Sequence, residues 1–462
     1  MRRLAAPGLS GLLFLVCLPA QGHGFGARYD LPLPLPLWIA GAVSTVVLSF
    51  VVMALAVRSG ADAASSPARV VRDTSTDAMA RAIVFIARLL AVAMLVLIVV
   101  AGSIGDQMPT SNIAPTAIWI GWWVGFSYLS AFGGDIWAVV NPWSTIFEGF
   151  ERLASRDGGS DMPRHAWPQA LGAWPACLLF LVFAWLELVW DGRSIPSKLA
   201  ACVMAFSLLT WAGMFLYGRR TWLQHADPFA LAFGILARLS PARLRAGVPE
   251  GRDMTPSLVV FVLLMLSTVT FDGVMATPAW QRIQDAAYAA LPVPAGTRLA
   301  IINTAGLIVF CALVVAVYHG VARWIAHACG HAMSPGEAAR AFVLTLVPIA
   351  IAYLLAHYLA YFLVQGQLLI RLISDPFGFG WNLFGTARFR PDVGIVGTRF
   401  VWYTSLIAIV LGHVVAVMLA HIVALRRLRD RTLAARSQLP MLALMVGYTM
   451  MSLWIVAQPI VE

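Results

Sequence analysis

Apolar runs close to the length of a membrane-spanning helix recur along the whole of this 462-residue chain. A helix needs about 20 apolar residues to cross the hydrocarbon core of a bilayer. The runs of this kind are 37–57, 89–104, 117–132, 170–190, 199–217, 257–271, 299–319, 342–364, 400–422 and 439–457. The sequence therefore predicts an all-α fold, a polytopic bundle of about ten transmembrane helices, and leaves no stretch for a separate soluble domain.

The composition agrees with a chain whose main solvent is lipid. Hydrophobic residues make up 60% of the sequence and charged residues only 12%, with a mean hydropathy of +0.80. Soluble domains carry about 25% charged residues. The net charge of +10 could suggest a nucleic-acid partner, but the arginines lie in short loops between apolar runs. That distribution is typical of topogenic signals in membrane proteins, so we expect no nucleic-acid partner.

The first 22 residues have the organisation of a secretory signal peptide. Arg2 and Arg3 precede a short apolar segment, residues 12–19, and small residues follow at the expected cleavage site. We predict a cleaved signal peptide, residues 1–22, followed by one integral membrane domain, residues 23–462. An uncleaved first anchor is the alternative. Cleavage would make His23 the first residue, and its amine and imidazole together would suit copper or zinc.

The positive charges predict how the helices are oriented. Alternating from an external N-terminus, the predicted cytoplasmic loops hold 21 lysine and arginine residues and the outer segments hold nine. Cytoplasmic loops carry such an excess in membrane proteins. The pattern predicts a multi-pass protein of the bacterial cell inner membrane, with the mature N-terminus and the C-terminus both in the periplasm.

Ionisable residues occur inside or at the ends of five of the predicted helices. Charged or titratable side chains are costly in the bilayer core and commonly mark functional sites. Glu187 and Asp272 are predicted near the outer ends of their helices, with His357 about two turns deeper and His413 near mid-membrane. His319 and His421 are further candidates, nearer the inner side. This distribution predicts a polar cavity open to the periplasm, which the long outer loop 365–399 could cap.

Such a cavity could hold a metal centre. Histidine and carboxylate ligands suit zinc or copper, and zinc-bound water ionises near neutral pH. The predicted metal ligands are His23, His357 and His413, and Glu187 and Asp272 are the candidate catalytic residues, as base or further ligands. In the alternative interpretation the carboxylates reach the interface and the histidines only bond neighbouring helices.

Other features of the sequence point to no familiar soluble-enzyme centre. There is no Walker A sequence, no GxSxG and no HExxH. His327, Cys329 and His331 form the string HACGH, but without a second ligand pair it is interpreted as a solvated cytoplasmic loop. Two apolar stretches, 135–150 and 228–239, are predicted to be either interfacial helices or, preferably, loop helices packed beneath the bundle.

Several short strings carry a resemblance to a known family. They are HGFGARYDLP from His23, VNPW from Val140, WLELV from Trp185, FDG from Phe271, AHY from Ala356, QGQ from Gln365, GHV from Gly412 and AH from Ala420. Together they resemble a bacterial family of polytopic membrane proteins labelled fenitrothion hydrolase, and the resemblance runs through most of the mature chain. It implies hydrolysis of an organophosphorus phosphotriester to a dialkyl phosphate-type acid and a nitrophenol. It implies no particular catalytic residues and no particular metal.

Two classes of function remain open from the sequence. The first is a membrane-embedded hydrolase whose partners are the lipid bilayer and an apolar small-molecule substrate dissolved in it. The second is a protein that transports a metal or solute, or handles copper, through the same polar residues. A third interpretation makes the chain the membrane subunit of a hydrolase complex, with a catalytic partner subunit. The resemblance favours the hydrolase.

Overall fold

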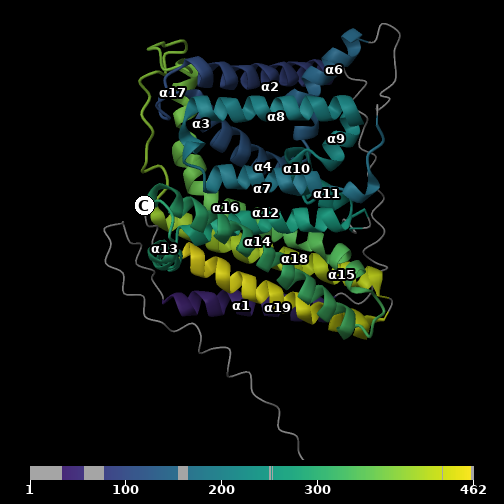
Figure 1. Ribbon diagram of the computed structural model, residues 1–462. Helices are drawn as coiled ribbons and strands as arrows, with labels where there is room; N and C mark the ends of the chain where they lie inside the picture. The colour runs from purple at the N-terminus through teal and green to yellow at the C-terminus, as the bar shows by residue number, and fades with distance from the viewer. Residues whose placement is uncertain are drawn as a thin grey trace, which may run out of the picture.

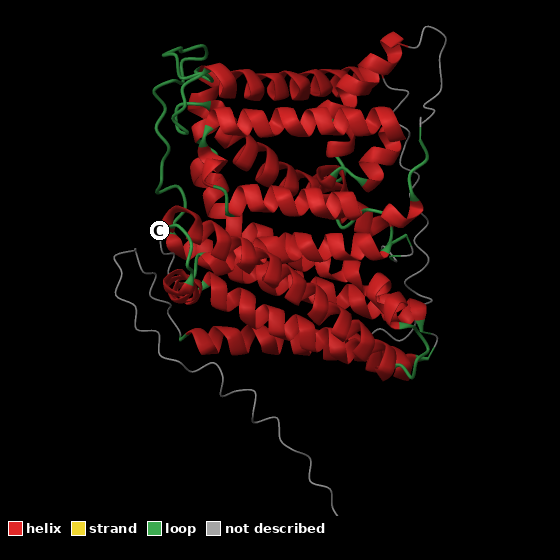
Figure 2. Cartoon of the chain, viewed as in Figure 1, coloured by secondary structure: helices red, strands yellow, loops and turns green. Residues whose placement is uncertain are grey.

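The structure is a computed structural model that describes residues 34–56, 78–154, 165–248, 251, 253–428 and 430–458. Every regular element among these residues is a helix (Figure 2). The predicted signal peptide and His23 lie outside the described residues. The all-α prediction is confirmed.

Nine helical segments of the described residues are long and apolar enough to cross a membrane, so the chain is a multi-pass membrane protein. Two of these segments are extended at their start, α7 by η5 (Gln169–Leu171) and α16 by α15 (Pro335–Phe342) and η7 (Val343–Leu346). The main helices are α1 (Leu35–Ala56), α2 (Ala78–Ile104), α7 (Trp174–Leu188), α8 (Pro196–Tyr217), α12 (Pro256–Met275), α14 (Ala295–Ala328), α16 (Val347–Gln365), α18 (Thr398–Arg427) and α19 (Arg431–Val456).

The remaining predicted span, residues 117–132, is also helical but is built differently. It lies in a continuous run of α3 (Ile113–Thr116), the π-helix η4 (Ala117–Val124) and α4 (Gly125–Gly133). The run contains three tryptophans and three glycines, and most of η4 is buried. It therefore packs mainly against protein.

The long helices lie side by side and alternate in direction (Figure 1). The start of α1 and the end of α19 lie at the same end of the bundle, as does the segment between α16 and α18. The arginine pattern predicts that this end faces the periplasm, and we call it the outer end. The shorter helices α6 (Pro142–Ala154), α9 (Arg219–His225) and α11 (Pro241–Ala246) lie at the opposite, inner end.

Local sequence signals set where several helices begin. Proline occupies the first turn of α8, α12 and α15, where its missing N–H is not needed. The side chains of Thr255, Ser334 and Asp430 accept hydrogen bonds from the first backbone N–H groups of α12, α15 and α19. These caps fix the inner ends of α12, of the segment that leads into α16, and of α19.

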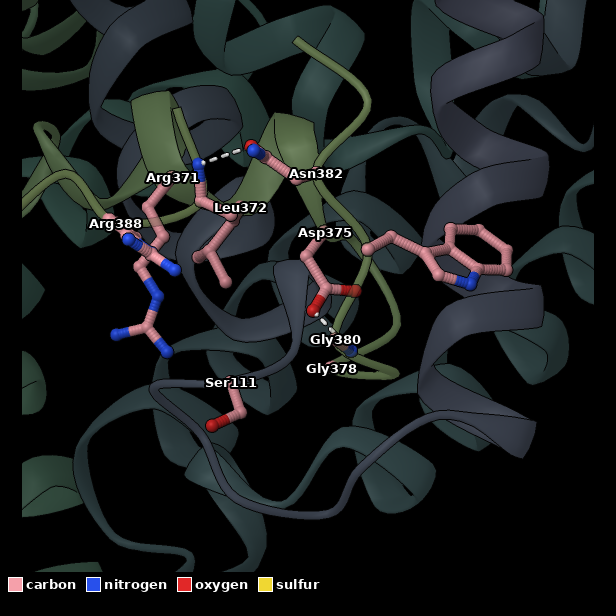
Figure 3. Close-up of a pocket in the computed structure, with 10 residues that line it drawn as sticks. Ser111, Arg371, Leu372, Asp375, Gly378, Gly380, Asn382 and Arg388 are labelled. Carbon is pink, nitrogen blue, oxygen red and sulfur yellow. Dashed lines mark hydrogen bonds between the residues drawn. The ribbon is translucent and has the colours of Figure 1, made fainter. Parts of the chain in front are cut away.

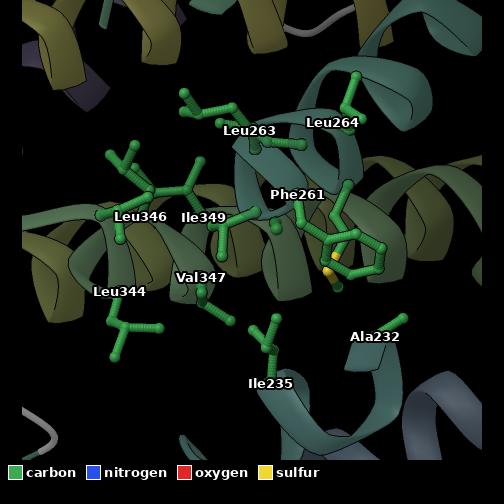
Figure 4. Close-up of a cluster of buried hydrophobic side chains, with 14 of the residues drawn as sticks. Ala232, Ile235, Phe261, Leu263, Leu264, Leu344, Leu346, Val347 and Ile349 are labelled. Atoms are coloured by element: carbon green, nitrogen blue, oxygen red, sulfur yellow. The ribbon is translucent and has the colours of Figure 1, made fainter. Parts of the chain in front are cut away.

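The core of the bundle is formed by α12 and α16. In the most apolar window of the segments containing them, 72% and 78% of residues are buried, compared with 6% in α2 and 17% in α14, which have mostly exposed apolar surfaces. Figure 4 shows apolar side chains of α12, η7 and α16 meeting Ala232 and Ile235 of α10 (Pro228–Ala237). Because α10 is largely buried among the other helices, it lies inside the bundle, neither at the membrane interface nor in a loop beneath the bundle as the sequence predicted.

Candidate functional site

Four polar side chains from three helices meet near the outer end of the bundle. Glu187 lies in the last turn of α7, Asp272 in the last turn of α12, and His357 and Tyr358 about two turns before the end of α16. We call these four residues the outer polar cluster. Three of them, Glu187, Asp272 and His357, are predicted site residues, and the structure brings them together.

Short hydrogen bonds connect the outer polar cluster. His357 Nε2 lies 2.8 Å from Asp272 Oδ2, and Tyr358 Oη lies 2.8 Å from the same oxygen. Tyr358 Oη is also 3.3 Å from Glu187 Oε1. A tyrosine hydroxyl has only one proton to donate. The two carboxyl groups therefore compete for that proton unless one of them is itself protonated.

The bond to Asp272 fixes the orientation of the His357 ring. A carboxylate can only accept, so Nε2 carries the hydrogen and Nδ1 is the acceptor nitrogen. Within the described chain Nδ1 of His357 has no hydrogen-bond partner. The side chains of His357 and Asp272 are 23% and 26% exposed, so the pair is not sealed in the core. The arrangement leaves an oriented proton acceptor.

Arg193 places a positive charge beside the two carboxyl groups. It lies in the short helix η6 (Asp191–Ser194) that follows α7, and its Nη1 donates to the carbonyl oxygens of Glu187 and Leu188 at 3.1 and 3.0 Å. Its own carbonyl accepts from Trp119 Nε1 at 2.8 Å. The guanidinium acts electrostatically on both Glu187 and Asp272. In the sequence Arg193 is one of the nine positive residues of the outer segments, and no spacing rule links it to Asp272.

Close packing holds α12 against α16 behind the cluster. The ring of Tyr353 stacks on His357 with centroids 6.0 Å apart and an interplanar angle of 8°. Gly273 makes room for this ring, because a Cβ at that position would lie 2.2 Å from Tyr353 Oη. Ser405 of α18 donates to the carbonyl oxygen of Ala356 at 3.1 Å and so fixes the other side of α16.

His413 does not join the outer polar cluster. Its neighbour Gly412 packs against Ala352, five residues before His357, which corresponds to about 7.5 Å along the helix axis. His413 Nδ1 donates to the carbonyl oxygen of Ile409 at 2.8 Å, and the buried Nε2 has no partner in the described chain. The packing therefore does not bring His357 and His413 together at one metal, as the sequence had predicted.

A second polar group surrounds His413 deeper in the bundle. The ring of Tyr448 lies 6.1 Å from that of His413, and its hydroxyl makes a short hydrogen bond with Thr270. Tyr353 Oη is buried without a partner in the described chain. We call His413, Tyr448, Thr270 and Tyr353 the inner polar group. The ring of Tyr353 stacks on His357, and Tyr448 acts electrostatically on the Tyr353 hydroxyl, so Tyr353 lies between the two sets.

The other histidine candidates make separate local contacts. His319 Nδ1 bonds the carbonyl oxygen of Val315 on its own helix. His421 Nδ1 lies 2.8 Å from Gln438 Oε1. In the HACGH string Cys329 is buried, while the rings of His327 and His331 lie 5.7 Å apart. Among the described residues no three His, Cys, Asp or Glu side chains are grouped so that they could hold a metal ion.

An apolar groove reaches the inner polar group from the side of the bundle. Its volume is about 370 Å³, and it runs between α12, α14 and α19. Its walls include Leu263, Phe310, Val317 and Met451, with Tyr448 among the lining residues. Tyr448 thus contributes both to this groove and to the polar group around His413.

The chain matches no family model, no curated protein and no solved structure. The candidate site therefore rests on its own geometry.

Proposed function

We propose that this protein is a membrane-embedded hydrolase in which His357, oriented by Asp272, takes a proton from the attacking water. The observation that carries the proposal is the 2.8 Å bond between His357 Nε2 and Asp272 Oδ2, which leaves Nδ1 without a partner in the described chain. A histidine held by a carboxylate in this way is a typical general base. The proposed substrate is an apolar organophosphorus phosphotriester, as the family resemblance implies.

The proposed reaction uses the residues of the cluster in distinct roles. The water oxygen forms a bond to phosphorus while its proton passes to His357 Nδ1. The bond from phosphorus to the aryl oxygen breaks, which releases a nitrophenolate and a dialkyl phosphate. Asp272 stabilises the imidazolium, and Arg193 supplies positive charge near the negative charge that develops on the phosphoryl group. Tyr358, whose hydroxyl lies 2.8 Å from Asp272 Oδ2, holds Asp272 in place.

A metal-assisted form of the reaction has less support. It requires His23, His357 and His413 at one ion, and His413 packs deeper in the bundle than His357. The proposal therefore assigns activation of water to the histidine–carboxylate pair.

Nitrophenol release from membranes that contain the full-length protein tests the proposal. We expect His357→Ala to lower the rate at least about 100-fold, because general base catalysis contributes about 10²- to 10⁴-fold. Asp272→Asn should cause a smaller loss, since the ring remains but loses its charged partner. The matched control is His319→Ala, whose ring bonds its own helix. Unchanged turnover of His357→Ala at equal protein level would refute the proposal.

A second candidate function is proton-linked transport of a solute. The observation that favours it is the inner polar group, which continues the set of titratable side chains inward from His357 through Tyr353 to His413. A hydrolase that works only at the outer end does not need these groups. Vesicles containing the purified protein and an internal pH indicator distinguish the two functions. Solute-driven proton uptake without nitrophenol release would favour transport.

A further inference from the structure

A separate polar pocket lies at the outer end, away from the contacts of the outer polar cluster. Its volume is about 420 Å³, within the range of small-molecule sites. It is lined by Ser111, by α17 (Leu368–Ser374) and by the segment that follows α17 (Figure 3). This segment belongs to the long outer loop that was predicted to cap a cavity.

The walls of the pocket are fixed by backbone hydrogen bonds. Both carboxylate oxygens of Asp375 accept from the turn that follows, from Phe379 N at 3.0 Å and Gly380 N at 2.8 Å. The loop is joined to the segment before α3 by Asp106 N, which donates to the Phe377 carbonyl oxygen at 2.8 Å. Gly378 has φ +72°, and a Cβ there would lie 2.8 Å from the Ser111 carbonyl oxygen. The pocket is therefore built into the fold of the loop.

Two arginines in this pocket have no anionic partner among the described residues. Arg371 and Arg388 both line it, and neither has a side-chain hydrogen bond or ion pair in the described chain. Figure 3 shows the two arginines on one side of the pocket, with Asp375 bonded to its own turn on the other. Two neighbouring guanidinium groups repel each other. A bound anion would remove this repulsion.

We propose that this pocket binds a phosphate-type anion through Arg371 and Arg388. Guanidinium groups bind phosphate oxygens in pairs of parallel hydrogen bonds, so two of them suit a phosphomonoester or phosphodiester. Ser111 and Asn382 add polar atoms, and Trp381 adds an apolar wall for an attached group. The anion comes either from a phospholipid headgroup of the outer leaflet or from a soluble alkyl phosphate.

Binding to the purified full-length protein tests this site, with inorganic phosphate and dimethyl phosphate as soluble probes and phosphatidylglycerol nanodiscs as the lipid probe. We expect the dissociation constant of at least one probe to rise tenfold or more in the double variant Arg371→Gln, Arg388→Gln. The matched control is Arg390→Gln on the same loop, which does not line the pocket and should bind as the wild type does. Binding should also weaken with added NaCl.

Each outcome of the experiment decides a specific point. Tight binding of dimethyl phosphate alone indicates a soluble ligand, and selective retention of phosphatidylglycerol over phosphatidylcholine indicates a lipid. No binding of any probe by wild-type protein, or equal binding by the double variant, overturns the site. A variant with Arg371→Lys and Arg388→Lys keeps the charges, so partial binding by it separates loss of ligand contacts from loss of folding. Binding is measured without turnover, so failure leaves the hydrolase proposal untouched.

Discussion

At the scale of single residues, depth in the membrane could be predicted from the sequence, whereas the direction of a side chain could not. Glu187, Asp272 and His357 have their expected positions near the outer end because residue number along a helix sets axial height. His413 was grouped with His357 although it packs deeper and bonds its own helix. Tyr358 directly follows His357, yet only the packing of α16 against α7 and α12 shows that its hydroxyl reaches both carboxyl groups.

Asp227 gives a prediction about pH at the residue scale. It caps α10, with Oδ1 accepting from Phe229 N and Ala230 N, and burial raises its pKa from 3.8 to about 6. Between these values the folded chain binds a proton that the unfolded chain does not, so stability falls as pH rises through this window. The loss is about 3 kcal/mol. The variant Asp227→Asn keeps an oxygen that can accept these hydrogen bonds. It should therefore remove the loss of stability at higher pH.

The apparent melting temperature of the purified protein at pH 4.5 and pH 7.5 checks this prediction. Asp227→Asn should melt above the wild type at pH 7.5 and close to it at pH 4.5. The control is Asp430→Asn at the exposed cap of α19, where hydrogen bonds from Thr432 and Leu433 lower the carboxyl pKa and the effect on stability has the opposite sign. A difference between Asp227→Asn and the wild type that does not change with pH would contradict the argument.

At the scale of helices, apolar run length was a good guide for lipid-facing elements and a poorer one for enclosed elements. The helix α2 has mostly exposed apolar side chains and was easily recognised. The run of α3, η4 and α4 was predicted from length, but its π-helical turn was not, because nothing in a periodicity argument specifies that geometry. Likewise the stretch 228–239 was predicted to lie at the interface or beneath the bundle, whereas tertiary packing puts α10 inside the bundle.

The contact of α12 with α16 gives a prediction at the same scale. Gly273→Ala would place a Cβ 2.2 Å from Tyr353 Oη and push the two helices apart. Overpacking of this kind typically costs about 1–3 kcal/mol. We expect a lower apparent melting temperature and slower nitrophenol release, because the distance between Asp272 and His357 depends on this contact. Gly320→Ala on α14, where a Cβ meets nothing within 4 Å, is the control and should change neither.

At the scale of the whole molecule, the charge distribution predicts which end of the bundle faces the periplasm. Asp285 is exposed on α13 (Pro278–Ala290) at the outer end, and Gly336 is exposed at the start of α15 at the inner end. With a membrane-impermeant maleimide on spheroplasts, Asp285→Cys should be labelled directly and Gly336→Cys only after lysis. The reverse pattern would indicate the opposite orientation in the membrane, with the outer polar cluster on the cytoplasmic side. The unchanged protein, whose described cysteines are mostly buried, serves as the background control.

The groove between α12, α14 and α19 has a consequence for how a compound is selected. Tyr448 lines that groove and also belongs to the inner polar group, so the polar interior touches the hydrocarbon region at this point. The occupancy of the groove by a compound that arrives by this route would depend on the concentration of that compound in the bilayer hydrocarbon, not on its concentration in the surrounding water. Each added methylene raises that concentration about fourfold, at about 0.8 kcal/mol. The partition of each compound into the hydrocarbon would then set its order of preference before any side chain contacted it.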